Sequence, residues 1–326
     1  MLKMNFRELM ESGIIEEKFM RRNRVTKYDE DNETYRINLY VTGITACPCK
    51  CKFCRNTEMN AESTQFNTEA FKQLYEKYGR NIRTVTFGGG EPLLYFDKII
   101  ELINERGVGY SGRALITSGL KSLFEEKARK IREDYWRFTN KLEMDAFFET
   151  IYLSRHHANN QKNQESFGTK QAILEKEDIR LLPAGIVNKM VVTTTCYKGG
   201  TSTLEDMKDM VNWTITSTIP SIIFNDLQQS MTDQNFYEQH QIEEGLFEEF
   251  AQSLTELSDD FRLKHQIVFS GGYTVTTYVS EKLRLKVGFK KYHKSREETL
   301  KAWQNARKRT FDLTMEPDGT VYLDQL

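Results

Sequence analysis

Short apolar runs alternate with longer amphipathic stretches along most of the chain. The apolar runs are four to eight residues long and rich in β-branched and aromatic residues, as is typical of buried strands. Strands are predicted at 35–42, 82–87, 114–117, 149–153, 189–194 and 221–224. Apolar residues at helical spacing predict helices between them, most clearly at 68–78 and 96–106. The alternation therefore predicts a series of six βα units.

These βα units favour a mixed α/β fold with parallel strands. A strand that returns through a helix to a parallel neighbour makes a right-handed crossover, and six crossovers in series build an open barrel. We therefore predict a partial (β/α)6 TIM-like barrel over residues 35–260. A complete eight-stranded barrel is the alternative, because residues 266–270 could supply another strand. In either barrel the functional loops are expected at the carboxyl ends of the strands.

The pattern changes near residue 260, where hairpin-like segments replace the βα units. These segments lie at 267–269, 273–279 and 283–289, and a basic helix ending at 307–309 follows them. Residues 315–322 combine two short strands with an Asp-Gly turn. We expect residues 261–326 to form a small β-rich α+β cap. Residues 1–34 are expected to form a short helix and a connecting arm.

Composition and charge narrow the range of partners. The 326 residues are 39% apolar, which is enough for a buried core, and they carry a formal net charge of −1. This balance favours neither nucleic acid nor an anionic membrane, and the basic run at 290–294 is typical of a solvated face. No apolar stretch has transmembrane length, and residues 1–8 lack an apolar signal core. We predict a cytoplasmic protein with no membrane partner.

Four of the five cysteines lie within eight residues, directly after the first predicted strand: Cys47-Pro48-Cys49-Lys50-Cys51-Lys52-Phe53-Cys54. Thiolates at Cys47, Cys51 and Cys54 can hold three irons of a [4Fe-4S] cluster and leave the fourth iron open. Cys49 lies inside the loop and is not one of the expected ligands, because a register that starts there has the wrong first spacing. Zinc is the alternative metal, but the sequence has no second Cys-x2-Cys or His-x3-His pair.

A glycine-acid turn, Gly88-Gly89-Gly90-Glu91-Pro92, follows the second predicted strand. Glycines allow a ligand to approach the backbone closely, and Glu91 supplies a negative charge opposite an ammonium group. Together, the two motifs resemble the signature of the radical S-adenosylmethionine (SAM) superfamily. That signature is Cys-x3-Cys-x-aromatic-Cys after the first barrel strand and Gly-Gly-Glu after the second.

The resemblance implies an enzyme with a [4Fe-4S] cluster and SAM as cofactors. Gly89, Gly90, Glu91 and Pro92 would take the methionine end of SAM, and Phe53 would contact the adenine. An electron from a donor such as flavodoxin or ferredoxin would cleave SAM to methionine and a 5′-deoxyadenosyl radical, which takes a hydrogen atom from the substrate. This chemistry is common to oxidoreductases, lyases and isomerases of the superfamily.

The substrate class is inferred from the layout of the chain. With one cluster motif and a short N-terminal segment, the chain is most similar to the molybdenum-cofactor-biosynthesis-type branch, without an extra-cluster C-terminal domain. Small-molecule or nucleotide-like substrates are frequent in that branch. Epimerisation or crosslinking of a ribosomally made peptide is the competing hypothesis, and a non-catalytic zinc-binding protein is a third.

Residues after the third and fourth predicted strands are further candidates for the site. In the family resembled, Thr117 and Ser118 would contact SAM, although Ser118 could equally cap a helix. Ser154 and Arg155 are expected near SAM in the same way. His156 and His157 follow them at the catalytic rim and are candidate substrate contacts, with a solvated loop as the alternative.

The fifth and sixth predicted strands end in two more candidates. Cys196 could return a hydrogen atom to a substrate radical if it faced the barrel interior, whereas lone cysteines are usually small buried hydrophobes. Asn225, together with the neighbouring Asp226, is a candidate polar contact to adenosine or substrate.

Overall fold

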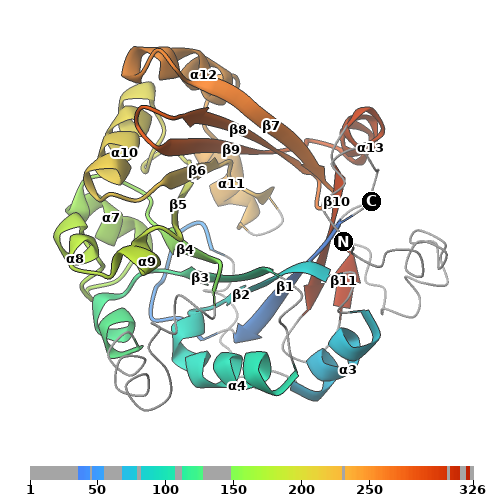
Figure 1. Cartoon of the computed structure of the whole chain (residues 1–326). Coiled ribbons are helices and arrows are strands. Elements are labelled where there is room, and N and C mark those ends of the chain that lie inside the picture. The colour runs from blue at the N-terminus through green and yellow to red at the C-terminus, as the bar shows by residue number, and fades with distance from the viewer. Residues whose placement is uncertain are drawn as a thin grey trace.

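One curved sheet of eleven strands organises the chain (Figure 1). The computed structural model describes residues 36–44, 46–54, 68–78, 82–106, 112–127, 148–229, 232–306, 309–315 and 321–323. Six neighbouring strands are parallel: β1 (Arg36–Ile44), β2 (Ile82–Gly89), β3 (Gly112–Thr117), β4 (Thr150–Ser154), β5 (Met190–Thr195) and β6 (Ser221–Asn225). The six strands predicted from the sequence are confirmed, with ends that differ by one or two residues.

Most of the helices lie outside this sheet, around its rim in Figure 1, whereas the helix of residues Gln234–His240 is drawn within the ring of strands. These helices are α3 (Thr68–Tyr78), η2 (Pro92–Tyr95), α4 (Phe96–Arg106), α7 (Asn160–Phe167), α8 (Lys176–Arg180), α9 (Ala184–Val187), α10 (Leu204–Thr216), α11 (Gln234–His240) and α12 (Leu246–Leu257). Residues 121–127 are also helical. The two helices that were clearest in the sequence, α3 and α4, have the predicted bounds.

The C-terminal strands complete the barrel wall. Strands β7 (Arg262–Phe269), β8 (Tyr273–Ser280) and β9 (Leu285–Tyr292) form an antiparallel meander, and β9 pairs in parallel with β6. Strand β10 (Arg309–Met315) pairs with both β7 and β1 and so nearly closes the sheet. The β-rich segment predicted beyond the six strands is therefore present. It satisfies the edges of β6 and β1, which would otherwise expose unpaired backbone groups.

Two details of this region differ from the sequence expectation or extend it. Helix α13 (Arg296–Asn305) ends before the basic run, and Arg309 begins β10. The short strand β11 (Val321–Leu323) pairs antiparallel with β10, as the strand–turn–strand signal predicted. Division of the chain at residue 260 remains a prediction, and the N-terminal arm expected at 1–34 lies outside the described residues.

The two faces of the barrel wall differ in burial. Along β5, Met190, Val192 and Thr194 are fully buried, whereas the alternate residues are only half-buried. The fully buried face points outward to the helices, as Phe224 of β6 shows by packing on Phe250 of α12 with ring centroids 5.7 Å apart. The half-buried residues therefore face the interior of the barrel. Within the described residues, no helix has the length and apolar character needed to cross a membrane.

Candidate functional site

The cysteine loop and the glycine-acid turn lie next to each other. They follow β1 and β2, which are neighbouring parallel strands, so both emerge at the same end of the barrel. The amide of Glu91 donates a hydrogen bond to the carbonyl of Ala46, 3.0 Å away, immediately before Cys47. Two motifs more than 30 residues apart in the sequence are thus joined by a direct backbone contact.

The cysteine loop is anchored on both sides. Within it, the amide of Lys50 donates to the carbonyl of Phe167, 2.8 Å away, at the end of α7. The hydroxyl of Thr232 donates to the carbonyl of Phe53 at 3.0 Å. Gly168 follows Phe167 with φ +57°, and a Cβ there would lie 2.4 Å from the Lys50 carbonyl oxygen. The loop is therefore held by close backbone packing that leaves no room for a side chain.

The four thiols of the loop have different environments. Cys49 is buried, Cys47 is exposed, and Cys51 and Cys54 are intermediate. Burial, and then the neighbouring thiols of Cys54 and Cys47, raise the pKa of Cys51. A hydrogen bond between Cys49 and Cys47 lowers the pKa of Cys47, whereas the same bond and burial raise that of Cys49. Thiolates gathered this closely repel one another, and bound iron would relieve the repulsion.

This donor set fits the three-thiolate attachment of a [4Fe-4S] cluster. The three expected ligands are reachable from the surface, and the buried thiol is the one that the spacing excluded. Among the described residues, no group of three His, Cys, Asp or Glu side chains is arranged to hold a single metal ion.

Glu91 is completely buried and is held by four uncharged donors. Oε1 accepts from the Thr117 hydroxyl at 2.8 Å and from the Leu93 amide at 3.1 Å. Oε2 accepts from the Ser118 amide at 2.9 Å and from the Ser118 hydroxyl. Burial raises the pKa of Glu91, and these hydrogen bonds oppose that rise. The carboxylate is therefore fixed in place without a basic partner among these donors, and its charge can attract a bound cation.

Thr117 and Ser118 lie at the site, but their hydroxyls bind Glu91. The alternative of Ser118 as a helix cap has no support, because its hydroxyl is used at Glu91. A contact from Thr117 or Ser118 to SAM remains a prediction. What the structure adds is that the ends of β2 and β3 are tied together through the Glu91 carboxylate.

Two tyrosines that the sequence did not single out support the glycine turn. The Gly89 amide donates to the Tyr40 hydroxyl at 2.9 Å, and the Tyr95 hydroxyl donates to the Gly88 carbonyl at 2.9 Å. A Cβ on Gly88 would lie 2.2 Å from the Tyr40 oxygen, so this position requires glycine. Tyr40 is on the same face of β1 as Asn38, and only the barrel register could have shown that this face meets the turn.

The ring of Phe53 lies in an aromatic cluster with His156 and Tyr197. Its centroid is 4.6 Å from the His156 ring, edge to face, and 5.2 Å from the Tyr197 ring. His156 Nδ1 accepts from the Thr195 amide at 3.1 Å, and burial lowers the pKa of this histidine to about 3. His156 is therefore neutral near pH 7 and sits directly behind the cysteine loop. Phe53 and His156 are brought together, while their predicted contacts to adenine and substrate remain predictions.

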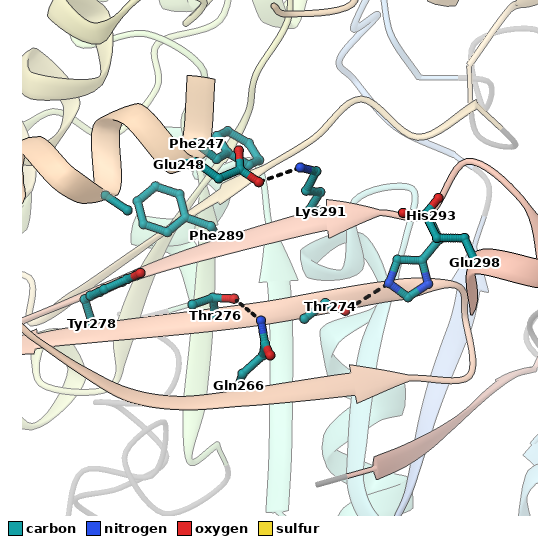
Figure 2. A pocket seen from close by; sticks show the side chains of 11 residues that line it. Phe247, Glu248, Gln266, Thr274, Thr276, Tyr278, Phe289, Lys291, His293 and Glu298 are labelled. Atoms are coloured by element: carbon teal, nitrogen blue, oxygen red, sulfur yellow. Dashed lines mark hydrogen bonds and ion pairs between the residues drawn. The ribbon is translucent and has the colours of Figure 1, made fainter. Parts of the chain in front are cut away.

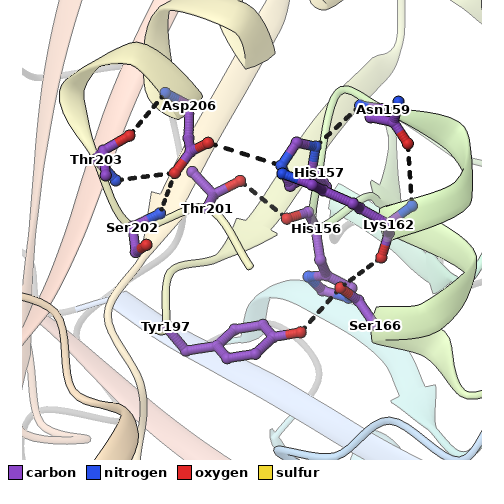
Figure 3. A network of polar contacts seen from close by, with 10 residues as sticks. All are labelled: His156, His157, Asn159, Lys162, Ser166, Tyr197, Thr201, Ser202, Thr203 and Asp206. Atoms are coloured by element: carbon purple, nitrogen blue, oxygen red, sulfur yellow. Dashed lines mark hydrogen bonds and ion pairs between the residues drawn. The ribbon is translucent and has the colours of Figure 1, made fainter. Parts of the chain in front are cut away.

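His157 belongs to a polar network that also includes His156 and Tyr197 (Figure 3). Its Nδ1 accepts from the Asn159 amide at 2.9 Å, and its Nε2 lies 3.6 Å from Asp206 of α10. Asp206 also accepts from the Ser202 and Thr203 amides at the start of that helix. Burial is the main cause of the lowered pKa of His157. This geometry places His157 between the Asn159 loop and the start of α10, and it does not support the predicted substrate contact.

Arg155 and Cys196 point away from the barrel interior. The guanidinium of Arg155 is 4.0 Å from the Trp213 ring of α10 and donates to the Ala158 carbonyl at 2.9 Å. Burial lowers its pKa to about 10. Cys196 is completely buried in the hydrophobic core, on the face of β5 that meets the helices. The geometry supports neither the SAM contact predicted for Arg155 nor the hydrogen-atom donor role of Cys196, because strand alternation places both on the outer face.

Ser154 and Asn225 do lie on the inner face. Both end their strands and are half-buried, and Asn225 pairs in register with Thr195 of β5. They are therefore at the end of the barrel where the cysteine loop emerges. Their predicted contacts to SAM and substrate remain predictions.

The chain is similar to known proteins in part of its sequence and in its fold. Residues 41–143 match the model of the Radical SAM superfamily. SuiB of Streptococcus suis, in a structure bound to S-adenosylmethionine, is 13% identical over 88% of this chain and 60% of its own, with a TM-score of 0.56. The radical SAM enzyme coproporphyrinogen III oxidase (HemN) of Escherichia coli is 11% identical over 71% of this chain and 55% of its own, with a TM-score of 0.42.

These matches have defined limits. The chain spans about half to three fifths of the length of the SuiB chains it matches, 46% in the complex with the precursor peptide SuiA and 60% in the SAM complex. A search of curated proteins gave no significant match. The SuiB comparison shows the fold, and the family model covers the cysteine loop and the glycine-acid turn. The part of the chain that carries both motifs, residues 41–143, is therefore similar to the radical SAM superfamily.

Proposed function

We propose that this protein cleaves SAM reductively at a [4Fe-4S] cluster and uses the resulting 5′-deoxyadenosyl radical to take a hydrogen atom from a small-molecule or nucleotide-like substrate. The observation that carries the proposal is the backbone contact between Glu91 and Ala46. This contact joins the cysteine loop to the glycine-acid turn, and reductive cleavage of SAM needs both motifs at one site.

In this proposal Cys47, Cys51 and Cys54 hold the cluster, which with SAM supplies the electron-transfer and radical chemistry. The chain's own residues bind and orient SAM. Glu91 presents a fixed carboxylate to the methionine ammonium of SAM, and Gly89 and Gly90 leave space for its approach. Glu91 acts as a binding group and not as a general base.

The barrel interior is the proposed place for the substrate. Its lining residues are half-buried, and Ser154, Thr195 and Asn225 give the rim polar groups. Cofactor and substrate sites in barrels of this kind form at the carboxyl ends of the strands. Modification of a ribosomally made peptide is the competing hypothesis, since the superfamily fold is shared with SuiB, which has been crystallised with its precursor peptide.

The proposal is tested by anaerobic reconstitution of the full chain with iron and sulfide, followed by reduction with dithionite in the presence of SAM. We expect about four irons per wild-type chain and the formation of 5′-deoxyadenosine. Cys51→Ala should lose both, while Cys196→Ala, which alters a core thiol, should keep both. A wild-type chain that binds a full cluster and SAM but gives no 5′-deoxyadenosine, even with candidate substrates, would contradict the proposal.

A further inference from the structure

A lysine inside the barrel is held between two aromatic rings. The ammonium of Lys290, on β9, lies 3.8 Å from the centroid of the Tyr273 ring and 4.9 Å from that of the Tyr292 ring. Aromatic faces attract a cation through their quadrupole and fix its position, but they do not neutralise its charge. Among the described residues, no hydrogen bond or ion pair involves this ammonium group. Its positive charge is therefore available to a ligand.

The strand register shows that Lys290 faces the interior. On β9, Phe289 pairs with Phe224 and packs against α12, with its ring centroid 5.5 Å from that of Phe247. Successive side chains on a strand point to opposite faces, so Lys290 points inward. It pairs in register with Asn225, the last residue of β6. The lysine therefore lies near the end of the barrel at which the parallel strands finish.

A polar network fixes the first of the two rings. The Tyr273 hydroxyl donates to Oδ2 of Asp312 on β10, and the Asn38 side chain of β1 donates to Oδ1 at 3.3 Å. The Asp312 amide donates to the Ser270 hydroxyl at 2.8 Å. Asp312 is 8% exposed and accepts from the neutral Tyr273 hydroxyl and Asn38 amide, and no ion pair joins it to Lys290 among the described residues. The cation and the carboxylate are thus held separately on the inner wall.

The same loop touches this cluster and the cysteine loop. After β6, Gln228 accepts from the Tyr292 hydroxyl at 2.9 Å. Four residues later, Thr232 donates to the carbonyl of Phe53 at 3.0 Å. The segment that follows β6 therefore contacts both the second ring at Lys290 and the loop that carries Cys54. A ligand at Lys290 would lie within the chamber proposed for the substrate.

The outer face of the same strand gives a direct contrast. A pocket of about 350 Å³ lies there between α12, α13 and the meander (Figure 2). Several of its polar groups are paired with one another, among them Lys291 with Glu248 at 2.5 Å and Thr274 with His293 at 2.9 Å. Lys290 and Lys291 are sequence neighbours, yet only Lys291 has a carboxylate partner.

We propose that Lys290 binds an anionic group of the substrate, a carboxylate or a phosphate, inside the barrel. This inference rests on the proposed function and narrows its substrate class. An ammonium that is positioned but not neutralised attracts an anion strongly in the partly desolvated interior, where charge interactions are screened less than in water. The inference favours acidic or phosphorylated small molecules over neutral ones.

The test measures anion binding on the reconstituted, unreduced full chain by calorimetric titration with inorganic phosphate and, separately, with acetate. Wild type and Lys291→Gln should bind one of the two anions with equal affinity. Lys290→Gln should bind it at least about tenfold more weakly, and Lys290→Arg should restore most of the affinity, because the charge returns. Preference for phosphate or acetate distinguishes a phosphorylated substrate from a carboxylate.

Three outcomes would overturn the inference: no binding of either anion by wild type, equal binding by Lys290→Gln, or equal loss in Lys291→Gln. Formation of 5′-deoxyadenosine without added substrate, measured on the same samples, separates this inference from the proposed function. If wild type binds the anion but forms no 5′-deoxyadenosine, even when candidate substrates are then added, the proposed function fails and the binding site stands. If it forms 5′-deoxyadenosine but Lys290→Gln binds anions normally, the inference about Lys290 fails alone.

Discussion

The substitution Gly88→Ala tests how the glycine turn is built. A Cβ at this position would lie 2.2 Å from the hydroxyl oxygen of Tyr40 and 2.6 Å from its Cζ, far inside contact distance. The ring would have to move, and the hydrogen bond from the Gly89 amide to the Tyr40 hydroxyl would break. We therefore expect the turn that carries Glu91 to shift.

The magnitude follows from these two effects. Overpacking of a buried position costs about 1–3 kcal/mol, and a lost hydrogen bond costs about 1 kcal/mol. Gly88→Ala should thus lower the free energy of unfolding by about 2–4 kcal/mol. In a Tyr40→Ala background the clash is absent, so the same substitution should cost almost nothing. The double-mutant cycle should give a coupling energy between positions 40 and 88 of about 2–4 kcal/mol, the difference between these two costs.

The assay is urea unfolding of the four proteins of this cycle, with the slope against urea compared among them. Formation of 5′-deoxyadenosine by the reconstituted proteins is measured in parallel, and Gly88→Ala should reduce it. The reasoning is refuted if Gly88→Ala costs less than about 1 kcal/mol in the wild-type background, or if its effect is the same with and without the Tyr40 ring.

Three further predictions use other parts of the site. Gly168→Ala should lower the iron content after reconstitution, because its Cβ would press on the Lys50 carbonyl. Gly245→Ala is the control, since Gly245 also has a positive φ, +90°, but nothing lies within 4 Å of its Cβ. This variant has the backbone strain of Gly168→Ala without the clash and should keep the cluster. The pKa of buried His156 is about 3 in the folded chain and 6.5 in its reference state. Between pH 7 and pH 5, therefore, only the unfolded chain takes up a proton at this residue. The free energy of unfolding should fall over this range by up to about 2 kcal/mol because of His156. Urea midpoints for His156→Asn, which keeps an acceptor, should depend less on pH, and an unchanged dependence would contradict the burial argument. Cys196→Ser should destabilise the core by about 1–3 kcal/mol, because it buries a hydroxyl, without changing the 5′-deoxyadenosine yield per folded chain; a selective loss of yield would return Cys196 to the mechanism.

Local patterns were enough to predict the parallel strands and both motif loops. Alternating apolar runs and amphipathic helices depend on neighbouring residues, so β1 to β6 and helices α3 and α4 follow from the sequence. The sequence pattern did not predict that the C-terminal strands complete the barrel wall. Their pairing with β6 and β1 joins residues far apart in the chain, and nothing in the hairpin pattern says which edge they meet.

The same limit applies to individual side chains. Proximity to a strand end suggested roles for Arg155 and Cys196, but whether a side chain points inward or outward depends on the exact register of the strand. Both follow the outer face and are buried against the helix layer. Conversely, Tyr40 and Lys290 carry no local motif, and only the folded barrel brings them to the glycine turn and to the inner wall.

The most direct test of the central claim compares two neighbouring cysteines of the same loop. Cys49→Ala and Cys51→Ala are each reconstituted with iron and sulfide, reduced in the presence of SAM, and assayed for 5′-deoxyadenosine. We predict product and about four irons per chain from Cys49→Ala, as from wild type, and neither from Cys51→Ala. Loss of iron and product from Cys49→Ala, with both retained by Cys51→Ala, would contradict the assignment of Cys47, Cys51 and Cys54 as the cluster ligands.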